Sequence, residues 1–172
     1  MDKTEILKEK LADAEVVLIG IGEEFNEKFD RIAEHEQLVK GLELVDAKEE
    51  LAWMVPYFEK IYLQEQNQSD ILSAYRNLYE LVKDKNYYIV TTCIDGLIQK
   101  AGFKPEKIVE PCGNYEKMQC SAKCSTKLYE SEEYANKIKE ALQDGTLEQV
   151  EQPVCPDCGA PLAFNNIVCE NY

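Results

Sequence analysis

Long hydrophobic runs are missing from this sequence. No stretch of about 18 apolar residues occurs, and that is roughly the length that a helix needs to cross a bilayer. The first ten residues, MDKTEILKEK, lack the apolar centre of a secretory signal peptide. We therefore expect a soluble, cytoplasmic protein without a membrane partner.

Basic residues are also scarce relative to acidic ones. The chain has 19 lysines and arginines against 33 aspartates and glutamates, which gives a formal net charge of −14. Because such a surface would repel a phosphate backbone, we expect no nucleic-acid partner. Solubility alone is a sufficient reason for this charge.

Apolar segments of strand length are present instead. The first segment covers residues 16–19 and is followed by Gly20. The second covers residues 87–92, and a third, shorter candidate covers residues 108–110. Continuous apolar runs of this kind are typical of parallel strands that are covered on both faces. Helical patterns alternate with them, over residues 5–14, 48–65 with a break at Pro56, 70–83, 96–101 and 132–143. This alternation predicts an α/β fold with a parallel sheet.

Seven cysteines occur in a chain that we expect to stay reduced, where thiols serve metal binding or redox chemistry more often than disulfides. Four of them form two close pairs, Cys120-x3-Cys124 and Cys155-x2-Cys158. Two such pairs can supply four tetrahedral thiolates to one Zn²⁺ and leave no open position for water. We therefore predict a structural zinc site. The alternative is four free buried cysteines or two redox-active pairs.

A glycine turn, Gly20-Ile21-Gly22, follows the first predicted strand directly. Glycines at such a turn let the backbone approach a pyrophosphate, and a helix N-terminus attracts its charge. A single G-x-G is weak evidence for a nucleotide, and the carboxylates of Glu23 and Glu24 would repel a diphosphate. These two carboxylates could instead stabilise the N-terminus of a helix.

Residues 88–103, YIVTTCIDGLIQKAGF, resemble the sirtuin (Sir2) segment T-x-N-x-D-x5-A-G. The run Glu110-Pro-Cys-Gly-Asn114 follows where sirtuins have a His-Gly pair, and the two cysteine pairs come after it. Bacterial macrodomain-linked sirtuins share the C-x3-C form of the first pair. The specific resemblance covers residues 86–165, while residues 10–22 match more loosely and residues 24–50 poorly.

The resemblance implies a partial Rossmann-like parallel sheet with a small inserted four-cysteine zinc module. The implied bounds are 1–115 for the NAD-binding part, with 163–172 returning to it, and 116–162 for the zinc module. Sirtuins cleave the nicotinamide–ribose bond of NAD and pass ADP-ribose to an acyl-lysine oxygen or sometimes to a protein side chain. The implied cofactors are therefore NAD and structural Zn²⁺, and the implied partner is an acylated or ADP-ribosylated protein.

The resemblance also implies roles for individual residues. The glycine turn would lie near the NAD phosphates through Gly20, Ile21 and Gly22. The nicotinamide and ribose pocket would be lined by Thr92, Cys93, Ile94 and Asp95. Cys112 would take the place of the general base, so that the catalytic residues would be Cys112, Cys93 and Asp95. Because the two corresponding sirtuin residues face one pocket, we expect the thiols of Cys93 and Cys112 to lie close together.

The sequence departs from the sirtuin pattern at these positions. Cys93 replaces the catalytic asparagine and Cys112 the histidine, and a thiol with a pKa near 8.5 is a poor substitute for imidazole at neutral pH. The only histidine, His35, lies in the poorly matched segment, where we expect an exposed helix residue. The strands that hold the adenosine half of NAD in sirtuins do not follow within these 172 residues, which suggests a truncated or repurposed product.

We therefore expect a Sir2-like, NAD-dependent protein deacylase or ADP-ribosyltransferase that is weak or inactive as this chain. One alternative is a catalytically silent sirtuin-like fragment that acts as a protein-interaction module. Another is a zinc-ribbon protein that binds no nucleotide.

Overall fold

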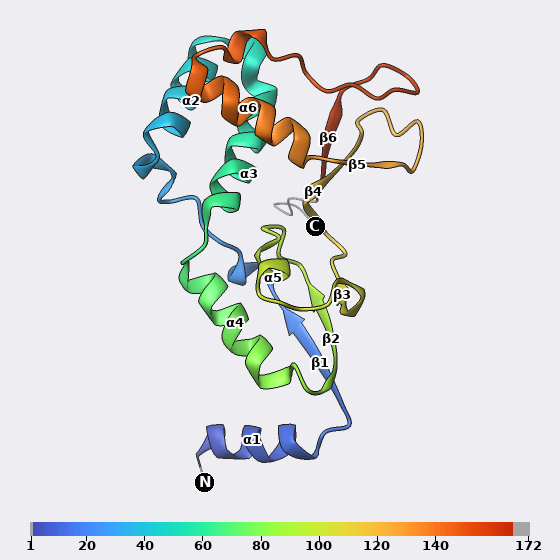
Figure 1. Ribbon diagram of the computed structural model, residues 1–172. Helices are drawn as coiled ribbons and strands as arrows, with labels where there is room; N and C mark the ends of the chain where they lie inside the picture. Colours follow the sequence, from blue (N-terminus) through green and yellow to red (C-terminus); the bar gives the residue numbers. More distant parts are fainter. Residues whose placement is uncertain (1, 167–172) are drawn as a thin grey trace.

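The computed structural model describes residues 2–166, which form two lobes with separate hydrophobic cores (Figure 1). The sheet lobe contains α1 (Lys3–Asp13), β1 (Val16–Ile21), α4 (Asp70–Val82), β2 (Asn86–Thr91), α5 (Leu97–Lys100) and β3 (Ile108–Val109). The cysteine lobe contains α2 (Glu36–Ala47), α3 (Val55–Glu65), β4 (Gly113–Cys120), β5 (Leu128–Glu130), α6 (Glu132–Asp144) and β6 (Leu162–Asn166). Short 3₁₀ helices connect them, at Glu23–Phe25, Ile32–Glu34, Glu49–Met54, Pro105–Lys107 and Leu147–Gln149. No helix within residues 2–166 is long and apolar enough to cross a membrane.

The sheet lobe is built on three parallel strands in the order β1-β2-β3. Ile19 is in register with Ile89, and Ile89 is in register with Ile108. The predicted parallel pairing of the first two apolar runs is therefore confirmed. Helix α4 begins where predicted, because the Ser69 hydroxyl accepts a hydrogen bond from the backbone N–H of Leu72 at 3.0 Å.

Only one face of this sheet is covered within the described residues. On that face Ile89 packs with Leu72 and Tyr75 of α4 and with Leu97 of α5. The other face exposes large apolar side chains, with exposed fractions of 55% for Val16, 74% for Leu18, 45% for Tyr88, 41% for Val90 and 58% for Val109. The expectation that both faces are covered was therefore wrong, because α4 and α5 pack on the same side.

The cysteine lobe combines helices with an antiparallel sheet in the order β5-β4-β6. Helix α6 packs on α2 and α3, and Gly41 of α2 allows close approach, since a Cβ there would lie 2.7 Å from a Leu142 methyl and 2.9 Å from the Phe58 ring. Proline is accepted at position 56 because it lies in the first turn of α3, after the 3₁₀ helix.

The lobes differ from the sequence-based domain bounds. Helices α2 and α3, which fall within 1–115, share one core with β4, β6 and α6. Residues 163–166 were expected to return to the NAD-binding part, and in the structure they pair with β4 in β6, with Phe164 opposite Met118. The remaining part of that range, 167–172, lies outside the described residues. The apolar alternation of β6 suits the core of the cysteine lobe, where Leu162 and Phe164 are buried.

Two lysines lie where the lobes meet, and one of them bonds across. The Lys100 ammonium of α5 donates hydrogen bonds of 2.9 Å to the carbonyls of Leu63 and Gln64 at the end of α3. Lys60 of α3 is only 1% exposed, and its ammonium lies 3.1 Å from Glu116 Oε1 of β4 as an ion pair without hydrogen-bond geometry. Glu116 in turn lies beside the Gly96 turn of the sheet lobe.

The backbone at Gly113 predicts a large difference between two glycine substitutions. Gly113 has a φ of 67°, and a Cβ there would lie 1.8 Å from the Asn165 carbonyl oxygen, whereas Gly145 has a φ of 70° but no atom within 4 Å of its Cβ position. We expect Gly113→Ala to lower the free energy of unfolding by more than about 4 kcal/mol. Gly145→Ala should cost only about 1–2 kcal/mol, the cost of the left-handed backbone. Urea unfolding of both variants measures this, and equal losses would contradict the crowding at Gly113.

Candidate functional site

The carboxyl ends of β1 and β2 lie side by side, which brings together two groups of predicted site residues. Ile21 is in register with Thr91, and the backbone N–H of Thr92 donates to the Ile21 carbonyl at 3.0 Å. The glycine turn therefore adjoins residues 92–95. Ligands of open parallel sheets bind at such an edge.

Asp95 is the most tightly held of these residues. Its side chain is buried, with 5% exposed, and it accepts hydrogen bonds from the backbone N–H of Glu27 at 2.7 Å and of Leu97 at 2.9 Å. Burial raises the pKa of the Asp95 carboxyl, while the two N–H donors counteract part of this shift. Each carboxylate oxygen thus accepts one backbone hydrogen bond and keeps a second acceptor site for a ligand.

Cys93 is turned inward. Its thiol is 2% exposed and donates to the Gly22 carbonyl at a sulfur–oxygen distance of 3.1 Å. Its backbone N–H donates to the Thr91 hydroxyl at 3.1 Å. Burial raises the pKa of the Cys93 thiol, which favours the protonated form that can donate to Gly22. The Cys93 thiol therefore links the loop after β2 to the glycine turn by a hydrogen bond.

Cys112 lies half-buried in the turn between β3 and β4. The N–H of Gly113 closes this turn by donating to the Glu110 carbonyl at 2.9 Å. The Glu110 carboxylate accepts from the side-chain amides of Gln99 at 3.2 Å and Asn114 at 2.9 Å, and burial raises its pKa. A shared pocket for the thiols of Cys93 and Cys112 stays a prediction.

The glycine turn has the shape, but not the charge, of a diphosphate site. A Cβ added at Gly20 or Gly22 would meet no atom within 4 Å, so the turn leaves room for a ligand to approach its backbone. A hollow of about 490 Å³ adjoins it, lined by Ile19, Gly20, Ile21, Gly22, Glu24, Phe25 and Leu78. Glu24 is the one charged residue in this lining. NAD could therefore be held through backbone N–H groups, without help from a cation of this hollow.

The four predicted metal ligands come together. The sulfurs of Cys120, Cys124, Cys155 and Cys158 all lie within 4.8 Å of one another, with 3.4 Å from Cys120 to Cys158 and 3.5 Å from Cys124 to Cys155. A zinc tetrahedron with bonds of about 2.3 Å has sulfurs roughly 3.8 Å apart. The donor set and its spacing therefore fit a structural Zn²⁺.

Tight turns place these sulfurs. Lys123, between the cysteines of the first pair, has a left-handed φ of 52°. Gly159, directly after the second pair, has a left-handed φ of 75°. The Gly159 N–H donates to the Cys155 carbonyl at 2.8 Å. Although desolvation raises the pKa of the Cys155 thiol, N–H groups of Asp157 and Cys158 outweigh it and lower the pKa to about 6. This favours the thiolate that zinc binds.

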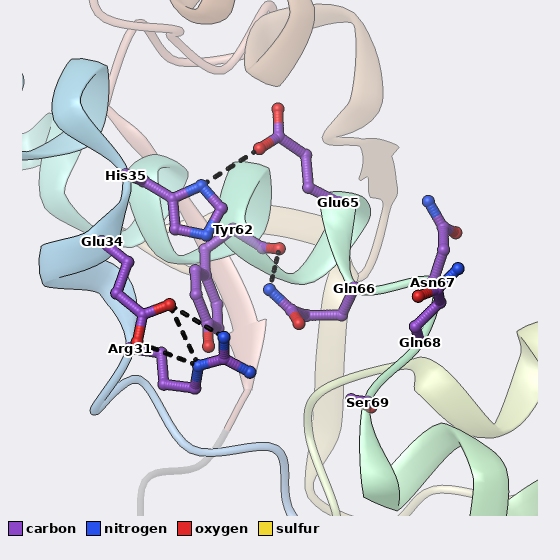
Figure 2. Close-up of a pocket in the computed structure, with 9 residues that line it drawn as sticks. All are labelled: Arg31, Glu34, His35, Tyr62, Glu65, Gln66, Asn67, Gln68 and Ser69. Atoms are coloured by element: carbon purple, nitrogen blue, oxygen red, sulfur yellow. Dashed lines mark hydrogen bonds and ion pairs between the residues drawn. The ribbon is translucent and has the colours of Figure 1, made fainter.

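His35 lies at a different place, a polar depression of about 410 Å³ between the 31–35 turn, the end of α3 and the 66–69 linker (Figure 2). It precedes α2 and is half-buried, in contrast to the expected exposed position. Its Nδ1 lies 3.4 Å from Glu65 Oε2, and its ring meets that of Tyr62 edge-on. Arg31 is paired with Glu34 at 2.8 Å. These groups are satisfied by one another and identify no ligand.

Sequence reasoning missed the residues of the segment after the glycine turn. Asn26 and Glu27 contact Ile94 and Asp95 directly, through hydrogen bonds of 2.8 and 2.7 Å. They fall in the range 24–47, which carries no clear periodicity, and only their position after a strand-ending glycine turn could have pointed to them.

The cysteine cluster predicts how the chain responds to losing one thiol. We expect about one zinc per molecule in the parent protein and well under one in Cys155→Ser. The cysteine lobe should then unfold before the sheet lobe, because metal binding supplies folding free energy to the module that holds it. Metal analysis and hydrogen exchange measure the two effects. Cys112→Ser, outside the cluster, is the control and should keep its zinc, and four freely titratable thiols in the parent would contradict the site.

Comparisons with known proteins agree with this arrangement. The profile of the Sir2 family matches residues 15–168. A protein ADP-ribosyltransferase from Staphylococcus aureus (strain Mu50 / ATCC 700699) is 25% identical over an alignment 181 residues long. The alignment covers 95% of this chain and 56% of that protein.

Solved structures show the same fold. A mutant Sir2 homologue in complex with ADP-ribose has a TM-score of 0.60 at 15% identity, and the match covers 100% of this chain and 65% of that one. A Sir2 enzyme structure has a TM-score of 0.55 at 19% identity, and the match covers 98% of this chain and 63% of that one.

The chain thus spans between about half and two thirds of the length of these relatives. The family profile nevertheless includes both the sheet lobe and the cysteine pairs. The chain belongs to the Sir2 family.

Proposed function

We propose that this chain carries the NAD-binding and zinc-binding parts of a sirtuin-type transferase. The observation that supports it best is that the glycine turn adjoins the loop carrying Asp95 at the carboxyl ends of two parallel strands. NAD would supply the ADP-ribosyl group. Gly20, Ile21 and Gly22 would lie near its phosphates, while Thr92, Ile94 and Asp95 would face its nicotinamide and ribose.

The reaction class follows from the relatives. One relative is a protein ADP-ribosyltransferase, and a Sir2 structure of TM-score 0.53 is bound to a propionylated peptide. Both support a protein substrate, acyl-lysine or an ADP-ribose acceptor. Structural zinc would hold the cysteine lobe in shape through Cys120, Cys124, Cys155 and Cys158 and take no part in the chemistry.

The proposed activity is weak or nil for these 172 residues. Cys93 points its thiol at the Gly22 carbonyl, and Cys112 would have to act as a base with a thiol where the family has an imidazole. Glu24 opposes a diphosphate at the turn.

A silent interaction module is the second candidate function. The uncovered sheet face favours it, because five large apolar side chains on three strands stay exposed there. Contiguous apolar surface of this kind is typical of sites that another polypeptide covers. Such a module would need neither NAD turnover nor a base at Cys112.

Calorimetric titration of NAD distinguishes these two functions. We expect the sirtuin-type chain to bind NAD weakly, with a dissociation constant in the range of about 1 mM. Gly20→Ala should fold normally, because its Cβ meets no atom, but should bind NAD at least several-fold more weakly if the phosphates approach that turn. No heat with NAD in the parent protein would favour the interaction module.

Deacylation is the second measurement. We expect no detectable turnover of an acyl-lysine peptide with NAD, for the reasons given for Cys93, Cys112 and Glu24. A turnover that depends on NAD and disappears in Asp95→Ala would contradict the proposed inactivity while supporting the site.

A further inference from the structure

The segment that follows the glycine turn lies along the loop that follows β2. Four hydrogen bonds join the two segments, and their partners follow one another in chain order along both. The pairs are Ile21 O with Thr92 N at 3.0 Å, Gly22 O with Cys93 Sγ at 3.1 Å, Asn26 Oδ1 with Ile94 N at 2.8 Å, and Glu27 N with Asp95 Oδ2 at 2.7 Å. The ligand edge of the parallel sheet is therefore occupied by the chain itself.

Ile94 and Asp95 offer one donor and one acceptor on neighbouring residues. A primary carboxamide is complementary to such a pair, since its carbonyl accepts and its NH₂ donates. In the structure Asn26 supplies a carboxamide carbonyl to Ile94 N–H, and the Glu27 N–H takes the place of the amide donor toward Asp95. The two residues together satisfy both positions.

The receiving groups are fixed independently of this segment. The Ile94 carbonyl accepts from the Tyr115 N–H at 3.2 Å, and the other oxygen of Asp95 accepts from the Leu97 N–H. The donor and acceptor would therefore keep their places if Asn26 and Glu27 moved away. Ile94 N–H would then lose its acceptor at a half-buried position and Asp95 one of its two donors, which is unfavourable unless a ligand replaces them.

The segment itself is held on both sides by aromatic contacts. The Phe25 ring packs edge-on against Tyr75 in the sheet lobe, with centroids 4.9 Å apart. The Phe29 ring packs against Tyr62 and Tyr115 in the cysteine lobe, with centroids 5.7 and 6.5 Å away. Residues 26–27 lie between these two anchors.

We propose that Asn26 acts as an intramolecular competitor for the site, which a ligand carboxamide must displace from the Ile94 N–H, while the neighbouring Glu27 N–H occupies one acceptor site of Asp95. The inference rests on the proposed function for the identity of that ligand, because the nicotinamide end of NAD carries a primary carboxamide. It deepens that function by giving the chain a built-in reason for weak binding. The competing contact lies in the described structure and does not depend on turnover.

Hydrogen exchange of the Ile94 amide, with nicotinamide as the probe, tests the competitor. In Asn26→Ala the amide loses its acceptor and should exchange roughly three- to tenfold faster, the factor expected for one net hydrogen bond. Nicotinamide should bind this variant several-fold more tightly than the parent and slow Ile94 exchange again. Nicotinic acid, whose carboxylate cannot donate to Asp95, should protect neither protein. Asn136→Ala, on the exposed side of α6, is the matched control and should behave as the parent.

Two results would overturn the proposal. One is unchanged Ile94 exchange in Asn26→Ala, and in Asn26→Ser should the alanine variant not fold. The other is faster exchange that nicotinamide does not reverse. Failure of the proposed function looks different: nicotinamide protects Ile94 in Asn26→Ala, which supports the competitor, yet neither protein binds intact NAD.

Discussion

The parallel pairing of β1 with β2 is the constraint on which the candidate site depends. It sets the end of one strand beside the end of the other, so that Gly22 meets Cys93 and Glu27 meets Asp95. A register shift of one residue would turn every side chain of β1 to the opposite face and separate these partners. The packing of the apolar sheet face against α4 therefore sets the strand register, and through it the positions of Gly22, Cys93 and Asp95, which follow the strands.

A buried carboxylate makes this edge of the sheet sensitive to what covers it. Taking the Asp95 charge out of water is unfavourable, and its two backbone donors offset part of that cost. One donor comes from the Asp95 loop itself and one from the segment after the glycine turn. The Glu27 N–H therefore helps to stabilise the Asp95 charge, and the same hydrogen bond helps this segment, which has no regular secondary structure, to hold a defined position.

Local patterns in the sequence were sufficient for much of the fold. The strand runs, the Ser69 cap and the two cysteine pairs each depend on neighbours within a few residues, and these predictions agree with the structure. An apolar run does not reveal whether another element covers it, so the exposed face around Leu18 could not be foreseen. The family resemblance aligns Cys93 with a catalytic asparagine, but this shorter side chain with its weak donor settles inward on the Gly22 carbonyl. The contacts of Asn26 depend on a loop 68 residues away, which no local pattern encodes.

Strand β4 runs from the region of the glycine-turn site to the cysteine cluster. It begins at Gly113, in the turn after β3, and ends at Cys120 in the cysteine cluster. Between them Glu116 faces the Gly96 turn, with the buried Lys60 behind it. Both partners of this ion pair belong to the cysteine lobe, and it is the contact of Glu116 with the Gly96 turn that reaches the sheet lobe. The metal-binding lobe is thus coupled to the loop after β2 through β4 and the contact of Glu116 with the Gly96 turn, although the cluster itself lies away from the glycine turn.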